Sequence, residues 1–169
     1  MFWLALLGGL CCTMMLTTPG VAESDRTVAG WVENVRLYPG NYLITAKLDT
    51  GADCCSLDAS DITEFYRGGE KWVRFNLMDQ DGKIKTMEAR VVRRVKIKRH
   101  NSTPERRPVI RLGICLGNIF GQAEINLEDR RNFEYPMLIG RNFLARRVVV
   151  DPGAKYRLTP NCGEQPSFE

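Results

Sequence analysis

The sequence predicts an all-β fold, a small closed or partly open β-barrel with one short helix near the C-terminus. The main observation is a hydrophobic pattern of period two that recurs from Val28 onward. Turn residues separate the alternating segments at close spacing, and no long amphipathic helical pattern lies between them. Many short strands without long helices favour a barrel over a layered α/β sheet.

The expected elements follow one another along the chain. Residues 42–47 form a strand-like run, and residues 73–77, 95–97, 110–116 and 123–127 alternate apolar with polar side chains. The segment 79–82, Asp-Gln-Asp-Gly, predicts a hairpin turn, and turns are also expected at residues 117–118 and 151–153. Residues 142–147 alone predict a short helix.

The composition is that of one ordinary domain. Of the 169 residues, 44% are hydrophobic and 26% are charged, which argues against a disordered, collagen-like or coiled-coil chain. His100 is the one histidine, and neither His-Glu-x-x-His nor Cys-x-x-Cys occurs in the sequence. A zinc site built on imidazoles is therefore not expected, and we expect neither a metal nor a cofactor.

Residues 1–22 predict an exported protein. They contain no charged residue, and the apolar run 2–16 has the length of the hydrophobic region of a signal peptide. Gly20 and Ala22 are the small residues that a signal peptidase needs, so we expect cleavage after Ala22, a mature domain of residues 23–169, and a periplasmic or secreted location. The alternative is an uncleaved N-terminal anchor, because no Lys or Arg precedes the apolar run. No second apolar segment is long enough to span a membrane.

Four cysteines remain after such a cleavage. They are Cys54, Cys55, Cys115 and Cys162. An exported location permits disulfides, and four cysteines allow three connectivities, which the sequence does not distinguish. Free thiols in a domain of this size are the other possibility.

Residues 90–111 hold nine Lys or Arg residues and a single acid, Glu105. No aromatic residue lies among them to stack on bases, so we expect no nucleic-acid partner. The positive charges fall on the polar face of alternating strands, which predicts a solvated surface that could attract acidic partners.

Two segments of the sequence indicate chemistry. Residues 48–53 read Leu-Asp-Thr-Gly-Ala-Asp and follow a strand, so that Asp49 lies at a strand end. Residues 137–144 read Met-Leu-Ile-Gly-Arg-Asn-Phe-Leu, an apolar strand that runs into a glycine and a short helix. Asp-Thr-Gly alone occurs often by chance in turns, but the two segments in this order are specific.

With these segments the chain resembles the retropepsin-like aspartic peptidases over residues 28–158. It is most similar to a bacterial branch often labelled ATP-dependent zinc proteases, which the runs 47–52, 107–110 and 137–141 match. The sequence offers no zinc ligand set and no Walker loop to support that label.

The resemblance implies roles for six residues. Asp49 is the catalytic acid, Thr50 and Gly51 support it, and Ala52, Asp53 and Arg141 bind substrate at the edge of the site. A surface ion pair is the alternative role for Asp53 with Arg141. The resemblance also implies a flap hairpin over residues 95–112, with its tip at residues 100–105, whose basic side chains would favour acidic or polar substrates.

Hydrolysis of this kind needs two carboxylates. One deprotonates a water molecule while the second, protonated, polarises the peptide carbonyl, so the pair shares one proton. The chain has a single Asp-Thr-Gly, so the second Asp is expected from another copy in a symmetric homodimer.

These points predict an exported aspartic endopeptidase that acts on a protein or peptide of the cell envelope. The alternative is a non-catalytic retropepsin-like domain that binds an extended peptide or serves as a scaffold in the envelope. A metallopeptidase is not expected.

Overall fold

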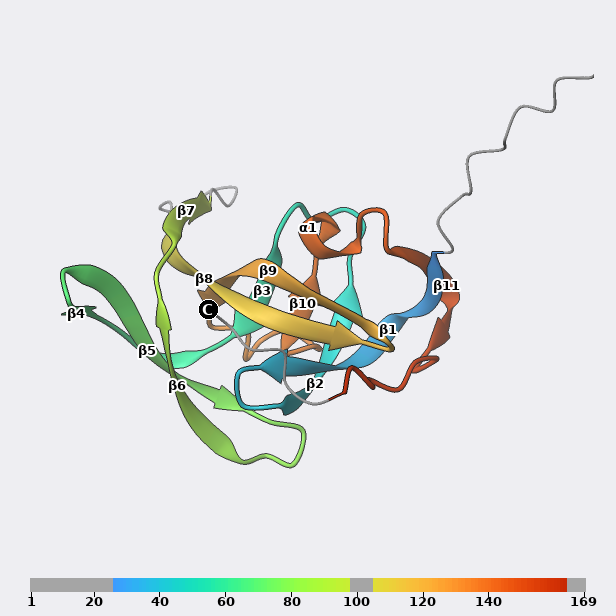
Figure 1. Ribbon diagram of the computed structural model, residues 1–169, viewed down its shortest axis with the longest axis horizontal. Helices are drawn as coiled ribbons and strands as arrows, with labels where there is room; N and C mark the ends of the chain where they lie inside the picture. The colour runs from blue at the N-terminus through green and yellow to red at the C-terminus, as the bar shows by residue number, and fades with distance from the viewer. Residues whose placement is uncertain (1–25, 98–104, 164–169) are drawn as a thin grey trace, which may run out of the picture.

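The computed structural model describes residues 26–97 and 105–163 as an all-β protein with one short helix (Figure 1). The predicted signal peptide lies outside the described residues. Among the described residues, no helix has the length and apolar character needed to cross a membrane.

Eleven strands and one helix follow in chain order. The strands are β1 (Thr27–Tyr38), β2 (Tyr42–Leu48), β3 (Cys55–Asp58), β4 (Ser60–Arg67), β5 (Glu70–Met78), β6 (Ile84–Arg90), β7 (Arg93–Ile97), β8 (Glu105–Leu116), β9 (Ile119–Glu128), β10 (Met137–Ile139) and β11 (Val148–Lys155), and the helix is α1 (Arg141–Leu144).

The larger sheet closes on itself. Its strand order is β11-β1-β2-β10-β3-β9-β8-β7, and β1 also pairs with β8. The strands β1, β2, β10, β3, β9 and β8 therefore form a closed six-stranded barrel, which confirms the predicted fold class. The remaining strands, β11 and β7, extend the sheet beyond β1 and β8.

The barrel interior is apolar because alternate residues of each strand point inward. Ile44, Leu57, Ile110, Ile125 and Phe143 are fully buried there. The predicted strands β8 and β9 are thus confirmed, and their direct pairing places Ile110 opposite Ile125. Burial does not alternate strictly in them, because β8 is buried on both faces over most of its length.

A second, three-stranded sheet of β4, β5 and β6 projects from one side of the barrel (Figure 1). One of its faces is apolar, and Val73, Phe75 and Leu77 belong to the same buried cluster as the barrel core. The predicted turn at residues 79–82 joins β5 to β6. The strand β4, which pairs with β5, was not predicted, because its residues do not alternate clearly.

Two local predictions are wrong. The helix spans Arg141–Leu144, not residues 142–147, because Ala145 already leaves helical geometry with φ −57° and ψ 130°. The segment 151–153, predicted as a turn, lies inside β11. The register of β11 against β1 shifts between Gly30 and Val32, and this irregularity accommodates the Pro-Gly pair within the strand.

The C-terminal segment is fastened to the barrel at two places. A disulfide joins Cys115 to Cys162, whereas Cys54 and Cys55 are free thiols. The buried Glu33 carboxylate accepts hydrogen bonds from the backbone N–H groups of Arg157 and Leu158, both at 3.0 Å. The structure thus has one disulfide and two free thiols, and it adopts none of the three connectivities that would pair all four cysteines.

Candidate active site

Asp49 lies directly after the end of β2, beside the neighbouring strand β10. Its backbone N–H donates to the carbonyl of Ile139 on β10, at 2.8 Å. The N–H of Gly51 donates to the Asp49 carboxylate, at 2.9 Å. Asp49 is half-buried, so its carboxylate is oriented by the loop and still accessible from outside.

The Asp-Thr-Gly loop is fixed by the segment that follows β10. The backbone N–H of Arg141 donates to the carbonyl of Ala52 at 2.8 Å, and that of Asn142 donates to the carbonyl of Asp53 at 3.0 Å. The Arg141 guanidinium also donates to the carbonyl of Thr50 at 2.9 Å. The structure therefore brings together the two segments that the sequence singled out.

Asp53 and Arg141 form an exposed ion pair, which agrees with the alternative role that the sequence predicted for them. Their side chains are 84% and 48% exposed, so water screens the charges and the pair stabilises the fold by at most ~1 kcal/mol. We therefore assign Arg141 its structural role mainly through the hydrogen bond to the Thr50 carbonyl, and less through the ion pair with Asp53. Ala52 and Asp53 lie in the same loop as Asp49, and the backbone N–H of Ala52 donates to the Asp49 carbonyl at 3.3 Å.

Close backbone contact explains the glycine between β10 and α1. A Cβ atom on Gly140 would lie 2.7 Å from the carbonyl carbon and oxygen of Cys54 and 2.9 Å from the carbonyl oxygen of Ala52. Only glycine allows the two segments to approach this closely.

The two adjacent cysteines have different surroundings. The Cys55 thiol donates to the amide oxygen of Asn142 at 3.0 Å and accepts from the N–H of Gly140 at 3.4 Å. Burial raises the pKa of Cys55 to about 12. Cys55 therefore acts as a buried hydrogen-bonding group between the loop and α1, while Cys54 is half-buried at the edge of the site.

A hollow of about 310 Å³ opens beside Asp49. We call it the Asp49 hollow. Besides Asp49, its walls combine aromatic, aliphatic, basic and acidic side chains, which are Trp31, Lys47, Arg130, Phe133, Glu134, Tyr135 and Leu138. Sequence reasoning missed this hollow and the basic residues in it, because the lining comes from three separate parts of the chain.

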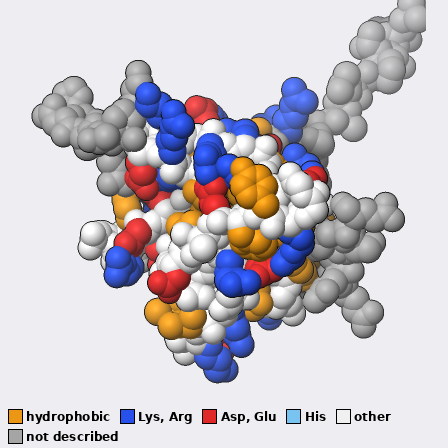
Figure 2. All heavy atoms as spheres, turned by 90° about the vertical axis from the view of Figure 1, so that its left-hand side faces the viewer, with side chains coloured by type: hydrophobic (Ala, Val, Ile, Leu, Met, Phe, Trp, Pro, Cys, Tyr) orange, Lys and Arg blue, Asp and Glu red, His pale blue; other side chains and the backbone are white. Residues whose placement is uncertain are grey.

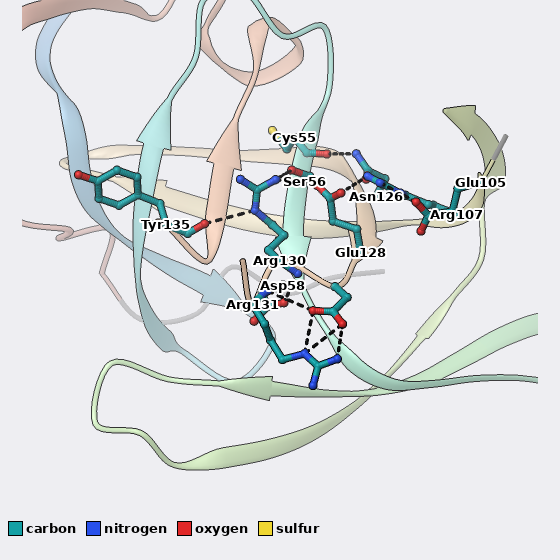
Figure 3. A network of polar contacts seen from close by, with 11 residues as sticks. Cys55, Ser56, Asp58, Glu105, Arg107, Asn126, Glu128, Arg130, Arg131 and Tyr135 are labelled. Carbon is teal, nitrogen blue, oxygen red and sulfur yellow. Dashed lines mark hydrogen bonds and ion pairs between the residues drawn. The ribbon is translucent and has the colours of Figure 1, made fainter. Parts of the chain in front are cut away.

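Arg130, which lines the hollow, belongs to a buried network of charges (Figure 3). Glu128 on β9 forms ion pairs with Arg107 on β8 and with Arg130, and all three side chains are 6–7% exposed. Arg130 also donates to the Ser56 hydroxyl at 2.8 Å and to the Tyr135 carbonyl at 3.2 Å. The network holds Arg130 rigidly at the wall of the Asp49 hollow.

The basic stretch 90–111 is largely neutralised by acids from other strands. Arg93 and Arg111 pair with Glu124 on β9, and Arg94 pairs with Glu64 on β4. On the side of the molecule that bears the smaller sheet, Lys and Arg side chains mix with Asp and Glu (Figure 2). These arginines are 41–53% exposed, which agrees with the predicted solvated surface, but their ion pairs with acids that are distant in sequence reduce its positive charge.

The predicted flap is described only in part. β7 and β8 pair as an antiparallel hairpin, with Ile97 opposite Glu105, which agrees with a hairpin in this region. Most of the predicted tip, including His100, lies outside the described residues. Within the described ranges no group of three or more His, Cys, Asp or Glu side chains is placed to hold a metal ion.

The closed barrel with one Asp-Thr-Gly loop braced by a Gly-Arg-Asn segment defines the retropepsin-like class of proteins. The model of one family, described as "Retropepsin-like aspartic endopeptidase RimB", matches residues 28–160, and the chain belongs to this RimB-like family. The predicted resemblance is confirmed at this level, although the family's description mentions neither zinc nor ATP.

Curated relatives carry a different name. Two proteins named "Probable alpha-L-glutamate ligase", from Shewanella pealeana and Shewanella halifaxensis, are each 36% identical to this chain over 118 residues, which are 68% of this chain. A protein of the same name from Desulfotalea psychrophila is 30% identical. The chain spans only about a quarter of the length of these relatives.

A solved structure has the same fold. The crystal structure of the Legionella pneumophila protein Lpg0085, described as having unknown function, superposes with a TM-score of 0.68 at 35% sequence identity. The match covers 78% of this chain and 97% of that one.

Proposed function

We propose that this protein is an aspartic endopeptidase whose active site is completed by a second copy of the chain. The observation that supports this most strongly is the Asp49 carboxylate, oriented by the Gly51 N–H in a loop that is braced from β10 and α1. Across a two-fold axis the two Asp49 side chains would share one proton.

The proposed reaction follows the chemistry of a carboxylate pair. The ionised Asp takes a proton from a water molecule, which attacks the peptide carbonyl, while the protonated Asp donates a hydrogen bond to the carbonyl oxygen. Because two close carboxylates are not both ionised, the pair would hold one proton between them. Thr50 would contact the partner loop across the axis.

We further propose a substrate that contains glutamate. The relatives are named for joining α-L-glutamate, and this domain corresponds to only part of their length. A hydrolase domain with basic side chains beside Asp49 suits the same acidic peptide chemistry. Export, with cleavage after Ala22, remains our proposal for the location.

The activity is tested by assaying the purified protein with glutamate-containing peptides between pH 4 and 7. We expect cleavage that a statine-type inhibitor blocks and that Asp49→Asn abolishes. The matched control is Asp81→Asn, which removes an exposed acid in the turn between β5 and β6 and should leave cleavage unchanged. Equal cleavage by the wild-type and Asp49→Asn proteins would refute the proposal.

A non-catalytic peptide-binding domain is the competing function. The naming of the relatives as ligases, of which this domain would be an accessory part, is the observation that favours it. That function predicts binding of the same peptides without cleavage by any form of the protein.

A further inference from the structure

Two basic residues, Lys47 and Arg130, line the Asp49 hollow. Lys47 is the one that lies near Asp49 in the sequence. It precedes Asp49 by two residues, so the alternation of an extended chain directs both side chains away from the buried Leu48. Leu138 of β10 lies opposite Lys47 in the neighbouring strand and lines the same hollow.

The other charged groups around the hollow already have partners. Arg130 is paired with Glu128, and the Glu134 carboxylate accepts a hydrogen bond from the Tyr135 hydroxyl at 2.7 Å. The Lys155 ammonium lies 4.2 Å from the centre of the Trp31 ring and donates to the Tyr135 hydroxyl at 3.2 Å.

Lys47 differs from these groups. Among the described residues no acid forms an ion pair with it, although it is half-buried. The aromatic and aliphatic walls around it lower the local polarity, which strengthens the attraction of an ammonium group for a carboxylate. Lys47 is therefore the available cation of the hollow.

We propose that Lys47 is a specificity-determining residue that binds the side-chain carboxylate of a substrate residue next to the scissile bond. The inference rests on the proposed endopeptidase function and adds to it the residue that selects the substrate. A flexible four-carbon side chain that starts two residues from Asp49 can reach a glutamate carboxylate while the adjoining peptide carbonyl lies at Asp49. Phe133, Leu138 and Trp31 would pack against the methylene groups of that glutamate.

A merely solvated lysine would behave differently. Its replacement would leave the preference among substrates unchanged, and a general effect of its charge on the Asp49 pair would alter the rates for all peptides together. The ratio of kcat/KM between an acidic peptide and its uncharged isostere therefore reports specifically on carboxylate binding.

The experiment uses the full-length protein and fluorogenic octapeptides in which one position next to the cleaved bond is fixed as Glu or Gln and the rest are shared. We expect the wild-type protein to prefer the Glu peptide by about 10- to 100-fold, the range for a charge-assisted hydrogen bond. Lys47→Met should reduce the preference to about 1, and Lys47→Arg should retain most of it.

Lys85→Met is the matched control. Like Lys47, Lys85 is a half-buried lysine in a strand, here β6. It lines a different hollow, together with residues of the β1–β2 turn. That turn precedes β2, whereas Asp49 follows the other end of the strand. Replacement of Lys85 should leave the preference at the wild-type value. An unchanged preference in Lys47→Met, or no preference in the wild-type protein, would overturn the inference while leaving the endopeptidase proposal intact.

A binding measurement separates the two proposals when nothing is cleaved. The Glu and Gln peptides are titrated into Asp49→Asn by calorimetry, with and without Lys47→Met. Tighter binding of the Glu peptide that depends on Lys47 supports carboxylate recognition. If such binding is found but the wild-type protein cleaves neither peptide, the endopeptidase proposal fails and the inference about Lys47 stands. If the affinity for the Glu peptide is the same with and without Lys47→Met, the inference is overturned.

Discussion

At the scale of single residues, Gly140 sets the distance between the two segments that form the site. Gly140→Ala would place a Cβ atom against the Cys54 backbone, which cannot yield as a flexible side chain can. We expect a loss of about 1–3 kcal/mol in the free energy of unfolding, measured by urea denaturation. Gly153→Ala is the control, because its Cβ would contact only the end of the Asp151 side chain at 3.3 Å. Equal losses in both variants would contradict the account.

The two free thiols should differ in reactivity. The pKa of Cys55, raised to about 12 by burial, keeps this thiol protonated and unreactive at pH 8, whereas Cys54 is accessible. Alkylation of the native protein with iodoacetamide, followed by peptide mass spectrometry, should modify Cys54 and spare Cys55. Modification of both before unfolding would show that Cys55 is not enclosed as described.

The residue scale also shows what the sequence could predict about the site. Asp49, Thr50, Gly51, Ala52, Asp53 and Arg141 were found from two short motifs, because each motif is local. Lys47 belongs to the matched motif but received no role of its own, and Arg130 has no motif around it. Both side chains line one hollow only because β2, β10 and the segment after β9 meet there.

At the scale of elements, Glu128 ties β8 and β9 to the segment that bears Arg130. Glu128→Gln would leave two buried guanidinium groups without their shared counter-charge, so we expect a loss of about 3–5 kcal/mol in the free energy of unfolding. Glu88→Gln, which affects exposed pairs with Arg67 and Arg74, should cost much less, because water screens these charges. A loss of that small size in Glu128→Gln would show that the network is solvated.

The pair of Arg93 on β7 with Glu124 on β9, which reaches across the intervening strand β8, predicts a pH dependence of the stability. The hydrogen bond from Arg93 lowers the pKa of Glu124 below its usual 4.5. A lowered pKa in the folded state stabilises the protein above about pH 4.5, and this stabilisation disappears as the pH falls through the folded-state pKa.

Glu124→Gln should therefore be less stable than wild type at pH 7 by a few tenths to about 1 kcal/mol, because both side chains are partly exposed. Thermal or urea unfolding at a series of pH values should show this difference shrinking below about pH 4.5. A difference that grows toward acid pH would have the wrong sign for this pair.

The elements also show where period-two alternation succeeds and fails as a predictor. It located β5, β8 and β9, whose alternating apolar side chains are buried in the core. It missed β4, which has little buried surface, and it misplaced the ends of α1, a helix of a single turn whose limits depend on the backbone of Ala145. The acids that neutralise the basic stretch came from β4 and β9, so the charge of the surface depended on pairings that the sequence alone does not contain.

At the scale of the whole molecule, the central claim is that two copies of Asp49 meet and share one proton. The barrel itself was predictable from alternation and motifs, but which strands close it was not, since the β1–β8 contact joins distant parts of the chain. In the same way, a site shared between two copies depends on contacts between chains, which the pattern of a single sequence does not specify.

The most direct test mixes wild-type and Asp49→Asn subunits, allows them to exchange, and measures peptide cleavage against the wild-type fraction at constant total protein. If both carboxylates are required, activity follows the square of that fraction, so an equal mixture retains about a quarter of the full rate. Activity that falls in direct proportion, to about half in the equal mixture, would mean that each chain is catalytic by itself and would contradict the shared site.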